Sequence, residues 1–334
     1  MVLVAQVWSR KNRKGIRPLN PGRDLGQLAD LVENAFGDEL SDGGARVLRE
    51  IRLLSRLGPL NHLLVGVNSQ DDGMFSGFVW EQDGRVVGNV TVNRPIGHTH
   101  KWQISNVAVW DTYRQRGVGR SLVEAAIELI VERVGRSAYL FVRDDNMPAM
   151  GLYRDLGFVE MDATTELKLA PPATRPRTDP LRLLRPLAPG QGHALYELVR
   201  RAEGPGRRWL YAIRRSKYVL PPDERLLRWL ESLLSGESRL RFGYPEGDVL
   251  HAAAVLRATR LWNLMPHQLQ VWVHPNWRDY LAERLADDIV SIVSGQAKRP
   301  TYVTLPACEA PVISALRKAG FGEVRTLIMM RLDL

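Results

Sequence analysis

The sequence predicts a mixed α/β protein built from two domains of the same fold. Its 334 residues are about twice the length of a typical domain, so two domains are expected. A proline-rich segment, residues 171–180, divides the chain into nearly equal halves. Because proline removes backbone donors and disfavours helix, this segment is typical of an exposed linker. We assign residues 1–170 to the first domain and residues 181–334 to the second.

Short motifs recur in the same order in the two halves, as expected when one fold is used twice. The motif Arg-Pro-Leu-x-Pro-Gly starts at Arg17 and again at Arg185. The motif Val-x-Val occupies residues 107–109 and 271–273, and Gly-Phe-x-Glu starts at Gly157 and at Gly320. The offsets lie between 163 and 168 residues, which indicates a weak internal repeat.

Strand-like and helix-like patterns alternate along the first half. Asp83-Gly84 is a hairpin turn signal between two strands. Leu122, Ala126 and Ile130 share the apolar face of one predicted helix. The predicted strands are 15–20, 76–82, 85–94, 101–109, 137–143, 158–161 and 164–169, and the predicted helices are 24–36, 43–56, 118–134 and 147–156.

Composition excludes several classes of protein. Hydrophobic residues make up 45% and charged residues 25%, which argues against a disordered or collagenous chain. The net charge of +9 favours anionic ligands. The single cysteine, Cys308, excludes a disulfide framework and a multi-cysteine metal site. No apolar run reaches the roughly 18 residues of a membrane span, and the N-terminal segment lacks the order of a secretory signal. We therefore expect a soluble cytoplasmic protein.

The first candidate site is a loop between a strand and a helix. The apolar strand ending at residues 107–109 leads through Gly117 and Gly119 into the helix predicted from residue 118. The first turn of a helix leaves N–H groups unpaired, and glycines let the backbone approach a diphosphate. Arg114, Arg116 and Arg120 add positive charge. The pattern fits an anion site, although a helix entry without a ligand explains the loop alone equally well.

The second candidate element is the segment 146–158. Asn146 is a good N-cap, Pro148 lies in the first turn and Gly157 suits the helix end. Tyr153 on this helix is either a half-buried residue with a locally satisfied hydroxyl or a functional group.

Together the motifs V-A-V at 107–109, R-x-x-G-x-G at 114–119 and N-x-x-A-x-x-L-Y-x-x-x-G-F at 146–158 resemble the GNAT superfamily of acyl-CoA-dependent N-acyltransferases. The resemblance covers roughly residues 15–170. It implies an α/β (α+β) fold, with a mixed, mostly antiparallel central sheet flanked by helices in each of two tandem GNAT-like domains. It also implies acetyl-CoA as co-substrate, direct attack by an amine, and no metal.

The resemblance implies a role for each matching residue. The backbone of Val107, Ala108 and Val109 would pair with the pantetheine arm, and one of its amides would polarise the thioester carbonyl. Asn146 would contact the pantetheine, and Tyr153 would stand near the sulfur as the catalytic proton donor. The amides that would hold the pyrophosphate are those of Gln115, Arg116, Gly117, Val118, Gly119 and Arg120.

The chain departs from the family where many members carry a glutamate as general base. Those positions are Gln103 and Phe141, and neither accepts a proton. Deprotonation is therefore expected through water or through a residue outside the motifs. His98 and His100 are either exposed loop residues or groups that face the acceptor, and they lack a nearby third metal ligand. Other polar residues considered are Asp144 and Asp145, as helix caps or acceptor contacts, and Cys308, as a nucleophile without a histidine partner.

The second half lacks the signature. With the offset of 164, Leu281 and Glu283 replace the glycines of the loop. With the offset of 163, Glu309 and Leu316 replace Asn146 and Tyr153. We predict a degenerate GNAT-like domain that keeps the fold without the cofactor and closes the acceptor site or presents an interface.

Three functions are compatible with these residues. Transfer of an acetyl group to a small-molecule primary amine is favoured over transfer to a protein or peptide amine. A non-catalytic acyl-CoA-binding module is the alternative from another class, although it would need no tyrosine donor. Arginines interleaved with aromatic residues between 200 and 218 suit either a nucleic-acid contact or a solvated basic face, and we favour the solvated face.

Overall fold

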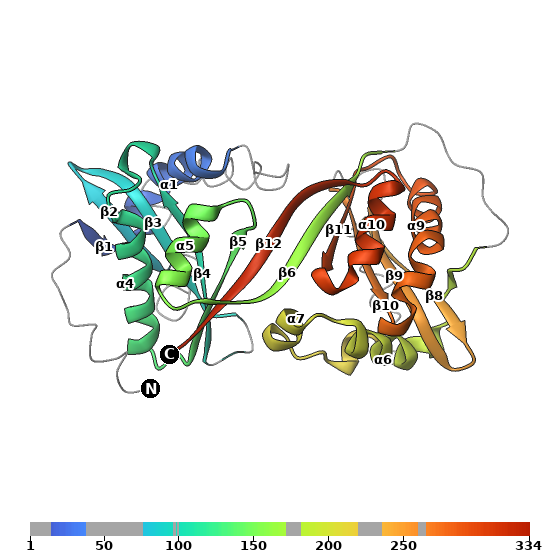
Figure 1. Ribbon diagram of the computed structural model, residues 1–334. Helices are drawn as coiled ribbons and strands as arrows, with labels where there is room; N and C mark the ends of the chain where they lie inside the picture. Colours follow the sequence, from blue (N-terminus) through green and yellow to red (C-terminus); the bar gives the residue numbers. More distant parts are fainter. Residues whose placement is uncertain are drawn as a thin grey trace. The chain divides into compact units, whose positions relative to one another are not determined.

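The computed structural model describes residues 15–37, 76–95, 98, 100–171, 182–219, 236–259 and 265–334. They form two compact units, each a mixed, mostly antiparallel sheet flanked by helices, which confirms the predicted fold class (Figure 1). The first unit comprises the described residues up to Val142, Asn146–Glu160 and Met330–Leu334, and the second comprises Arg143–Asp145 and Met161–Met329. This division differs from the predicted boundary at 171–180, of which residues 172–180 lie outside the described ranges.

In the described residues, the first unit contains five strands that are consecutive in sheet order, the start of one further strand and the end of another. Neighbouring strands β1 to β4 are antiparallel, whereas β4 and β5 are parallel. The end of β12 follows β5 in the order. The strands are β1 (Ile16–Pro18), β2 (Gly77–Gln82), β3 (Arg85–Asn93), β4 (Lys101–Val109), β5 (Ser137–Arg143) and β12 (Gly322–Asp333), and the helices are α1 (Pro21–Phe36), α4 (Val118–Glu132) and α5 (Met147–Asp155).

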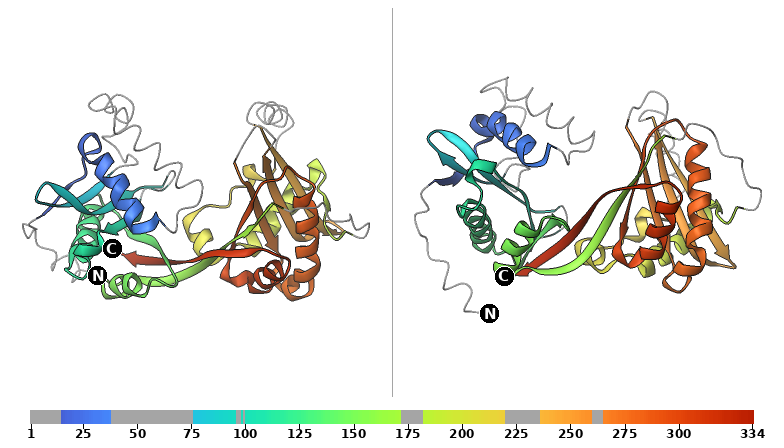
Figure 2. Two further views of the ribbon diagram at one scale, coloured as in Figure 1. Left: turned by 90° about the horizontal axis from the view of Figure 1, so that it is seen from above. Right: turned by 45° about the horizontal axis from the view of Figure 1, so that its top comes forward.

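Helices cover both faces of this sheet (Figures 1 and 2). Leu28 and Leu31 of α1 pack with Val79 and Ala108 on one face. On the other face, a Cβ atom added to Gly88 would lie 2.9 Å from side-chain atoms of Val118 and Leu122. Helix α4 therefore packs directly on the backbone of β3, which requires a glycine there.

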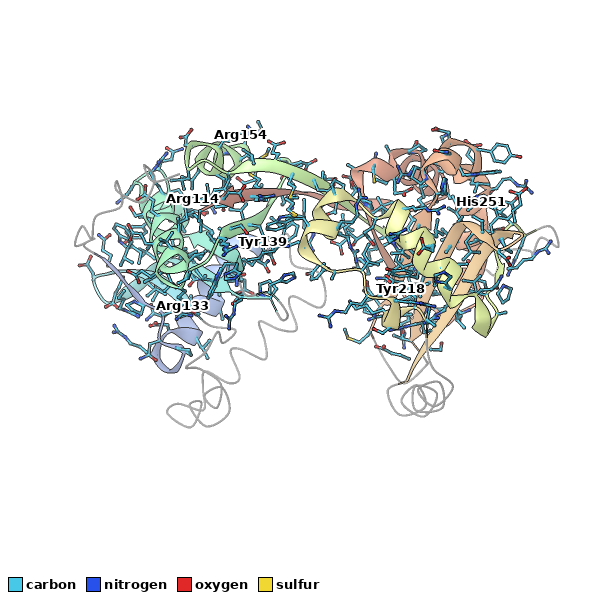
Figure 3. All side chains as sticks on the ribbon, turned by 90° about the horizontal axis from the view of Figure 1, so that it is seen from below. Arg114, Arg133, Tyr139, Arg154, Tyr218 and His251 are labelled. Atoms are coloured by element: carbon cyan, nitrogen blue, oxygen red, sulfur yellow. The ribbon has the colours of Figure 1, made fainter. Side chains whose placement is uncertain are left out.

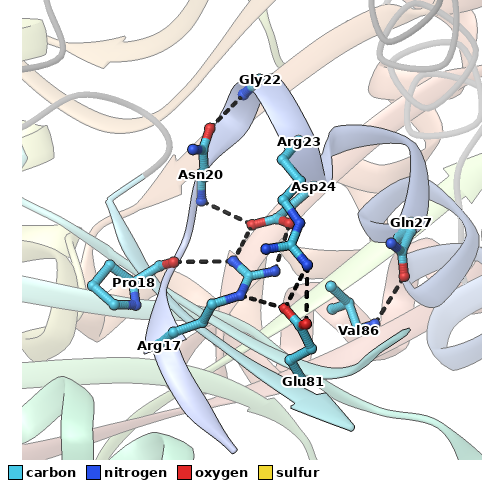
Figure 4. Close-up of polar contacts among 9 residues, drawn as sticks. All are labelled: Arg17, Pro18, Asn20, Gly22, Arg23, Asp24, Gln27, Glu81 and Val86. Carbon is cyan, nitrogen blue, oxygen red and sulfur yellow. Dashed lines mark hydrogen bonds and ion pairs between the residues drawn. The ribbon is translucent and has the colours of Figure 1, made fainter. Parts of the chain in front are cut away.

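An ion-pair cluster fixes the start of α1 to strands β1 and β2 (Figure 4). Arg17 donates two hydrogen bonds of 2.7 Å to the fully buried carboxylate of Asp24 and a third, of 2.5 Å, to Glu81. Asn20 caps α1 by accepting from the Gly22 amide. This N-cap explains why the helix begins at Pro21, three residues before the predicted start.

Three sequence predictions need correction or lie outside the described residues. The two strands predicted at 158–161 and 164–169 are one continuous strand, β6 (Val159–Leu169). Asp162, which lies between the two predicted strands, accepts a 2.8 Å hydrogen bond from the Gly206 amide through its carboxylate. The helix predicted at 43–56 lies outside the described ranges.

The second unit repeats the plan of the first. Its strand order is β12-β6-β11-β10-β9-β8-β7, and β10 and β11 are parallel as β4 and β5 are. Its largest apolar cluster joins the sheet to α9 and α10. The elements are β7 (Arg185–Pro186), α6 (Gly192–Ala202), α7 (Pro205–Leu210), β8 (Glu237–Glu246), β9 (Val249–Thr259), β10 (His267–Val273), α9 (Arg278–Ser294), β11 (Thr301–Pro306) and α10 (Ala310–Lys318).

Strands β6 and β12 each begin in one unit and end in the other. Strand β6 leaves the first unit after Glu160, and β12 enters it at Met330. Met330 is fully buried, and the Leu334 amide donates to the Arg136 carbonyl at 3.0 Å. Residues near the end of the chain are thus part of the first unit. None of the described helices has the length and apolar character needed to cross a bilayer.

Candidate functional site

The site in the first unit begins where two parallel strands separate. Strands β4 and β5 pair over only three residues each, Lys101–Gln103 of β4 with Ser137–Tyr139 of β5, although β4 continues to Val109. Beyond Gln103, no described strand pairs with the β5-facing edge of β4. Backbone N–H and C=O groups on such an edge need another partner. The backbone at Val107–Val109, predicted to bind pantetheine, lies on this stretch.

Strand β4 carries a bulge directly before this stretch. Asn89 of β3 pairs with Ala108, whereas Thr91 pairs with Ser105, so Val90 lies opposite two residues of β4. Asn106, one of these two, has a φ of 51°, a left-handed conformation that asparagine tolerates better than most residues. A bulge of this kind redirects the backbone that follows.

The glycine-containing loop follows Val109 and ends at the first turn of α4. Gln115 and Gly117 have φ values of 61° and 81°, and alternation with left-handed residues can turn successive amides toward one concave surface. Gly117 is the N-cap, so the amides of Val118 and Gly119 fall in the turn that a helix leaves unpaired. The predicted pyrophosphate-binding amides thus lie at an exposed helix N-terminus.

Arginine side chains surround this loop. Arg114 is exposed (Figure 3) and forms a 2.7 Å ion pair with Asp111, while Arg116 stacks over the ring of Tyr113 at 5.3 Å. Arg120 forms a 3.1 Å ion pair with Asp155 at the end of α5. The predicted positive charge is therefore present, partly balanced by carboxylates.

Helix α5 brings the third motif next to the loop. Asn146 caps the helix by accepting from the Ala149 amide at 3.2 Å. A Cβ atom added to Gly119 would lie 3.7 Å from Leu152 and 3.8 Å from Val109, so the start of α4 adjoins both α5 and the end of β4. All three predicted motifs meet in one place.

Tyr153 is 6% exposed on α5, and burial raises its pKa to about 12. Its ring packs edge-on against Phe158. The hydroxyl has no hydrogen-bond partner among the described residues. The local partner that would make this a purely structural tyrosine is therefore missing from that part of the chain.

The positions where the family often has a glutamate hold no carboxylate. Gln103 accepts a 3.3 Å hydrogen bond from the Tyr139 hydroxyl, and Phe141 packs edge-on against the same ring (Figure 3 labels Tyr139). None of these three side chains is a carboxylate, and Tyr139 is buried at the start of the strand separation. They cannot take a proton from an ammonium group.

The remaining predicted candidates lie apart or have other partners. His100 contacts the Val134 carbonyl at 3.3 Å. Asp145 forms a bidentate pair with Arg143, which lowers the pKa of the Asp145 carboxyl. Cys308 is exposed, and Arg278 approaches its sulfur at 3.6 Å. Among the described residues, no three His, Cys, Asp or Glu side chains gather as a metal site would require.

The second unit keeps the separated strands but not the loop. Strands β10 and β11 also pair over only three residues, His267–Leu269 with Thr301–Val303. Four residues separate β10 from α9, whereas eight separate β4 from α4. The offset of 164 is therefore wrong after β10, and Gly117 and Gly119 correspond to Trp277 and Asp279 rather than to Leu281 and Glu283. The glycines are absent under either alignment.

Glu309 and Leu316 stand where the offset of 163 places them. Glu309 is the N-cap residue of α10, as Asn146 is of α5, and it is 2% exposed. Its carboxylate lies 3.0 Å from Arg278, and burial raises its pKa to about 7. Leu316 is fully buried. A buried carboxyl group thus occupies the position that corresponds to Asn146, the residue predicted to contact pantetheine.

The arginine-rich segments of the second unit are partly paired with acidic groups. Arg200 forms a 3.1 Å ion pair with Glu197, and Arg207 a 3.0 Å pair with Glu203. This pairing lowers the positive charge available to a nucleic acid.

The polar residues that surround the bulge were not predicted from the sequence. Asn89 and Thr91 alternate with valines along β3, and both are buried. Polar residues at every second position of a buried strand were the available signal, because such side chains need internal partners.

Comparison with known proteins gives results consistent with this geometry. Residues 46–158 match the acetyltransferase (GNAT) family. The N-alpha-acetyltransferase of Sulfurisphaera tokodaii is 34% identical over 94 residues, which are 25% of this chain and 56% of that protein. The matches to curated relatives span between 20% and 56% of the relatives' own length.

Solved structures resemble the chain over nearly its whole length. A GCN5-related N-acetyltransferase from Sphaerobacter thermophilus covers 95% of both chains, with 16% identity and a TM-score of 0.61. A tandem GNAT protein from the clavulanic acid biosynthesis pathway covers 95% of this chain and 98% of its own, with 17% identity and a TM-score of 0.52. At these identities the likeness concerns the fold. Residues 46–158 thus match the GNAT family, and the chain shares the fold of these two solved structures.

Proposed function

We propose that the chain is an N-acetyltransferase whose first unit transfers an acetyl group from acetyl-CoA to a primary amine. The observation that carries the proposal is the meeting of three elements: the separated edge of β4, the glycine loop and the helix with Asn146 and Tyr153. The second unit, which has the same strand separation, lacks the loop and the tyrosine. One acetyl-CoA site per chain is therefore expected.

In this proposal the backbone does most of the binding. The amides of residues 115–120 would hold the pyrophosphate at the start of α4, where the helix dipole favours an anion. The free edge at Val107–Val109 would pair with the pantetheine arm, and Asn146 would contact the same arm. Acetyl-CoA binds here as a co-substrate, and none of these contacts requires a metal.

The chemical step is a direct displacement. The neutral amine attacks the thioester carbonyl, a backbone amide of β4 stabilises the oxyanion, and the C–S bond breaks as the carbonyl re-forms. The amine nitrogen loses a proton to water, because Gln103 and Phe141 cannot accept it. Tyr153 donates to the departing thiolate. Because its pKa is near 12, Tyr153 is a weak acid. It stabilises the thiolate through a hydrogen bond, or it donates its proton and is then reprotonated from solvent.

A small-molecule amine is the first acceptor class, as the sequence predicts. A peptide α-amine is the second, favoured by the 34% identity to a protein named N-alpha-acetyltransferase. Because Gln103 and Phe141 cannot act as a base, an amine that is already partly deprotonated near neutral pH is the more suitable acceptor. An α-amino group, with an ordinary pKa of about 8, meets that condition better than a lysine side chain.

Calorimetry and a thiol-release assay on the full chain test the proposal. Calorimetry with acetyl-CoA should give one site per chain. In a screen of polyamines, aminoglycosides and short peptides, Tyr153→Phe should lower kcat about 10²-fold, the scale of a general acid, with acetyl-CoA affinity unchanged.

The matched control is Tyr302→Phe, a tyrosine that is 7% exposed in the second unit, and it should leave kcat unchanged. No binding, or two sites per chain, would contradict the proposal. Unaltered turnover in Tyr153→Phe would remove that residue from the mechanism.

A further inference from the structure

We infer that Asn89 is a positioning residue that holds the bulge of β4 and thereby sets the direction of the amides at Val107 and Ala108. The inference rests on the proposed function, because it matters for catalysis only if a thioester carbonyl lies against that backbone. Asn89 does not touch the predicted acetyl-CoA contacts through its side chain. It acts on the strand that makes them.

The side chain of Asn89 reaches the bulge directly. Its amide nitrogen donates a 3.0 Å hydrogen bond to the backbone carbonyl of Asn106, the residue with left-handed φ. The same nitrogen lies 3.5 Å from the Thr91 hydroxyl, which accepts a 3.3 Å hydrogen bond from the side chain of Asn106. The backbone and the side chain of Asn106 are thus held from one strand.

The burial of Asn89 lowers the stability of the fold. Asn89 is 2% exposed and lies on the sheet face that carries Val79 and Ala108. Its carbonyl oxygen has no hydrogen-bond partner within the described part of the chain. A buried amide with an unpaired oxygen destabilises a fold relative to an apolar side chain of the same size. The hydrogen bond to the Asn106 carbonyl best explains why an asparagine is buried at this position.

The second unit supplies an internal comparison. Strands β9 and β10 pair residue by residue, from the pair of Ala252 with Val273 to the pair of Arg257 with Gln268. No bulge interrupts this register. With the offset of 164, Ala253 replaces Asn89 and Val255 replaces Thr91. The unit that lacks the glycine loop and the tyrosine therefore also lacks the bulge and both side chains that hold it.

The test compares Asn89→Leu with Asn93→Leu in the full chain. Asn93 lies on the same strand and face, also has a carbonyl oxygen without a partner in the described structure, and donates to Ser105 rather than to the bulge. Loss of one oxyanion donor costs about 10²–10³ in kcat, and a displaced donor should cost at least tenfold. We expect Asn89→Leu to lower kcat at least tenfold, with the dissociation constant of CoA changed less than threefold, and Asn93→Leu to change neither.

Two kinetic results would overturn the inference. One is an unchanged kcat in Asn89→Leu, and the other is a parallel loss of kcat and CoA affinity, which a general structural role would produce. If Asn89→Leu does not fold, the same comparison uses Asn89→Ser, whose shorter side chain cannot reach the Asn106 carbonyl.

A crystal structure of the variant separates this inference from the proposed function. Asn106 should leave its left-handed φ in Asn89→Leu, whatever the enzyme acetylates, and a retained bulge would refute the positioning role. If the wild-type chain binds no acetyl-CoA, the proposed function fails, and the backbone of Asn106 still decides whether Asn89 holds the bulge.

Discussion

Replacement of Glu309 by glutamine is expected to stabilise the second unit at pH 8 and to change it little at pH 5. Glu309 is 2% exposed, at the position that Asn146 has in the first unit. Burial disfavours its charged form, and Arg278, 3.0 Å away, offsets only part of that cost. Glutamine has nearly the same shape as the protonated glutamate and never ionises.

The sign and size of this change in the free energy of unfolding follow from the raised pKa of Glu309. In the folded protein the pKa of Glu309 is about 7, against an ordinary value of 4.5. Between these values the folded state binds more protons than the unfolded state, so the free energy of unfolding is highest below pH 4.5 and falls as the pH rises through 7. Above pH 7, the difference between the two pKa values lowers the free energy of unfolding by about 3 kcal/mol. Glu309→Gln should lack this loss.

Urea unfolding of the wild type and the variant at pH 5 and pH 8, followed by tryptophan fluorescence, measures the effect. Trp272 reports on the second unit, because its ring nitrogen donates to Glu203 at 3.1 Å. Glu283→Gln, at a carboxyl that is 75% exposed, is the control and should follow the wild type. If Glu309→Gln loses as much stability between pH 5 and pH 8 as the wild type does, ionisation of Glu309 is not the cause of the loss.

Two further predictions concern the first unit. Gly117→Glu should abolish acetyl-CoA binding in calorimetry, because it adds a carboxylate to the loop that we propose holds the pyrophosphate. Gly84→Glu, at another exposed glycine with positive φ and open space around it, is the control for backbone strain, and equal binding by both variants would place the pyrophosphate elsewhere. Because burial raises the pKa of Tyr153 to about 12, this group stays protonated between pH 7 and pH 10, so Tyr153→Phe should lower kcat by the same factor throughout that range. An alkaline decline with an apparent pKa below 10 that disappears in Tyr153→Phe would contradict this assignment.

Local patterns predicted the elements around the site well. The strand before Val109, the glycine loop and helix α4 follow from apolar periodicity and helix-end signals. Asn146 as N-cap and Gly157 in the left-handed region after α5 follow from the same rules. These features depend on neighbours in the sequence, which is why sequence reasoning reaches them.

Features that depend on distant partners were missed. The bulge needs Asn89, which lies 17 residues before Asn106. The Asp162 carboxylate within β6 accepts from the Gly206 amide, 44 residues further on. The shorter loop before Arg278 changes the alignment of the two units, and a constant offset between repeats cannot show it. Period-two alternation indicates a strand, but it does not identify the neighbour in the sheet.

The course of β12 bears on how the chain is made. A domain that folds as it leaves the ribosome usually completes its structure from its own contiguous residues. Here Met330–Leu334 belong to the first unit, so the first unit cannot finish folding until all of the second has been translated. Premature termination anywhere between residues 171 and 329 would therefore leave the first unit incomplete, although all three motifs of its candidate site had already been synthesised. Synthesis of the half without the signature thus becomes a precondition for completing the half that carries it.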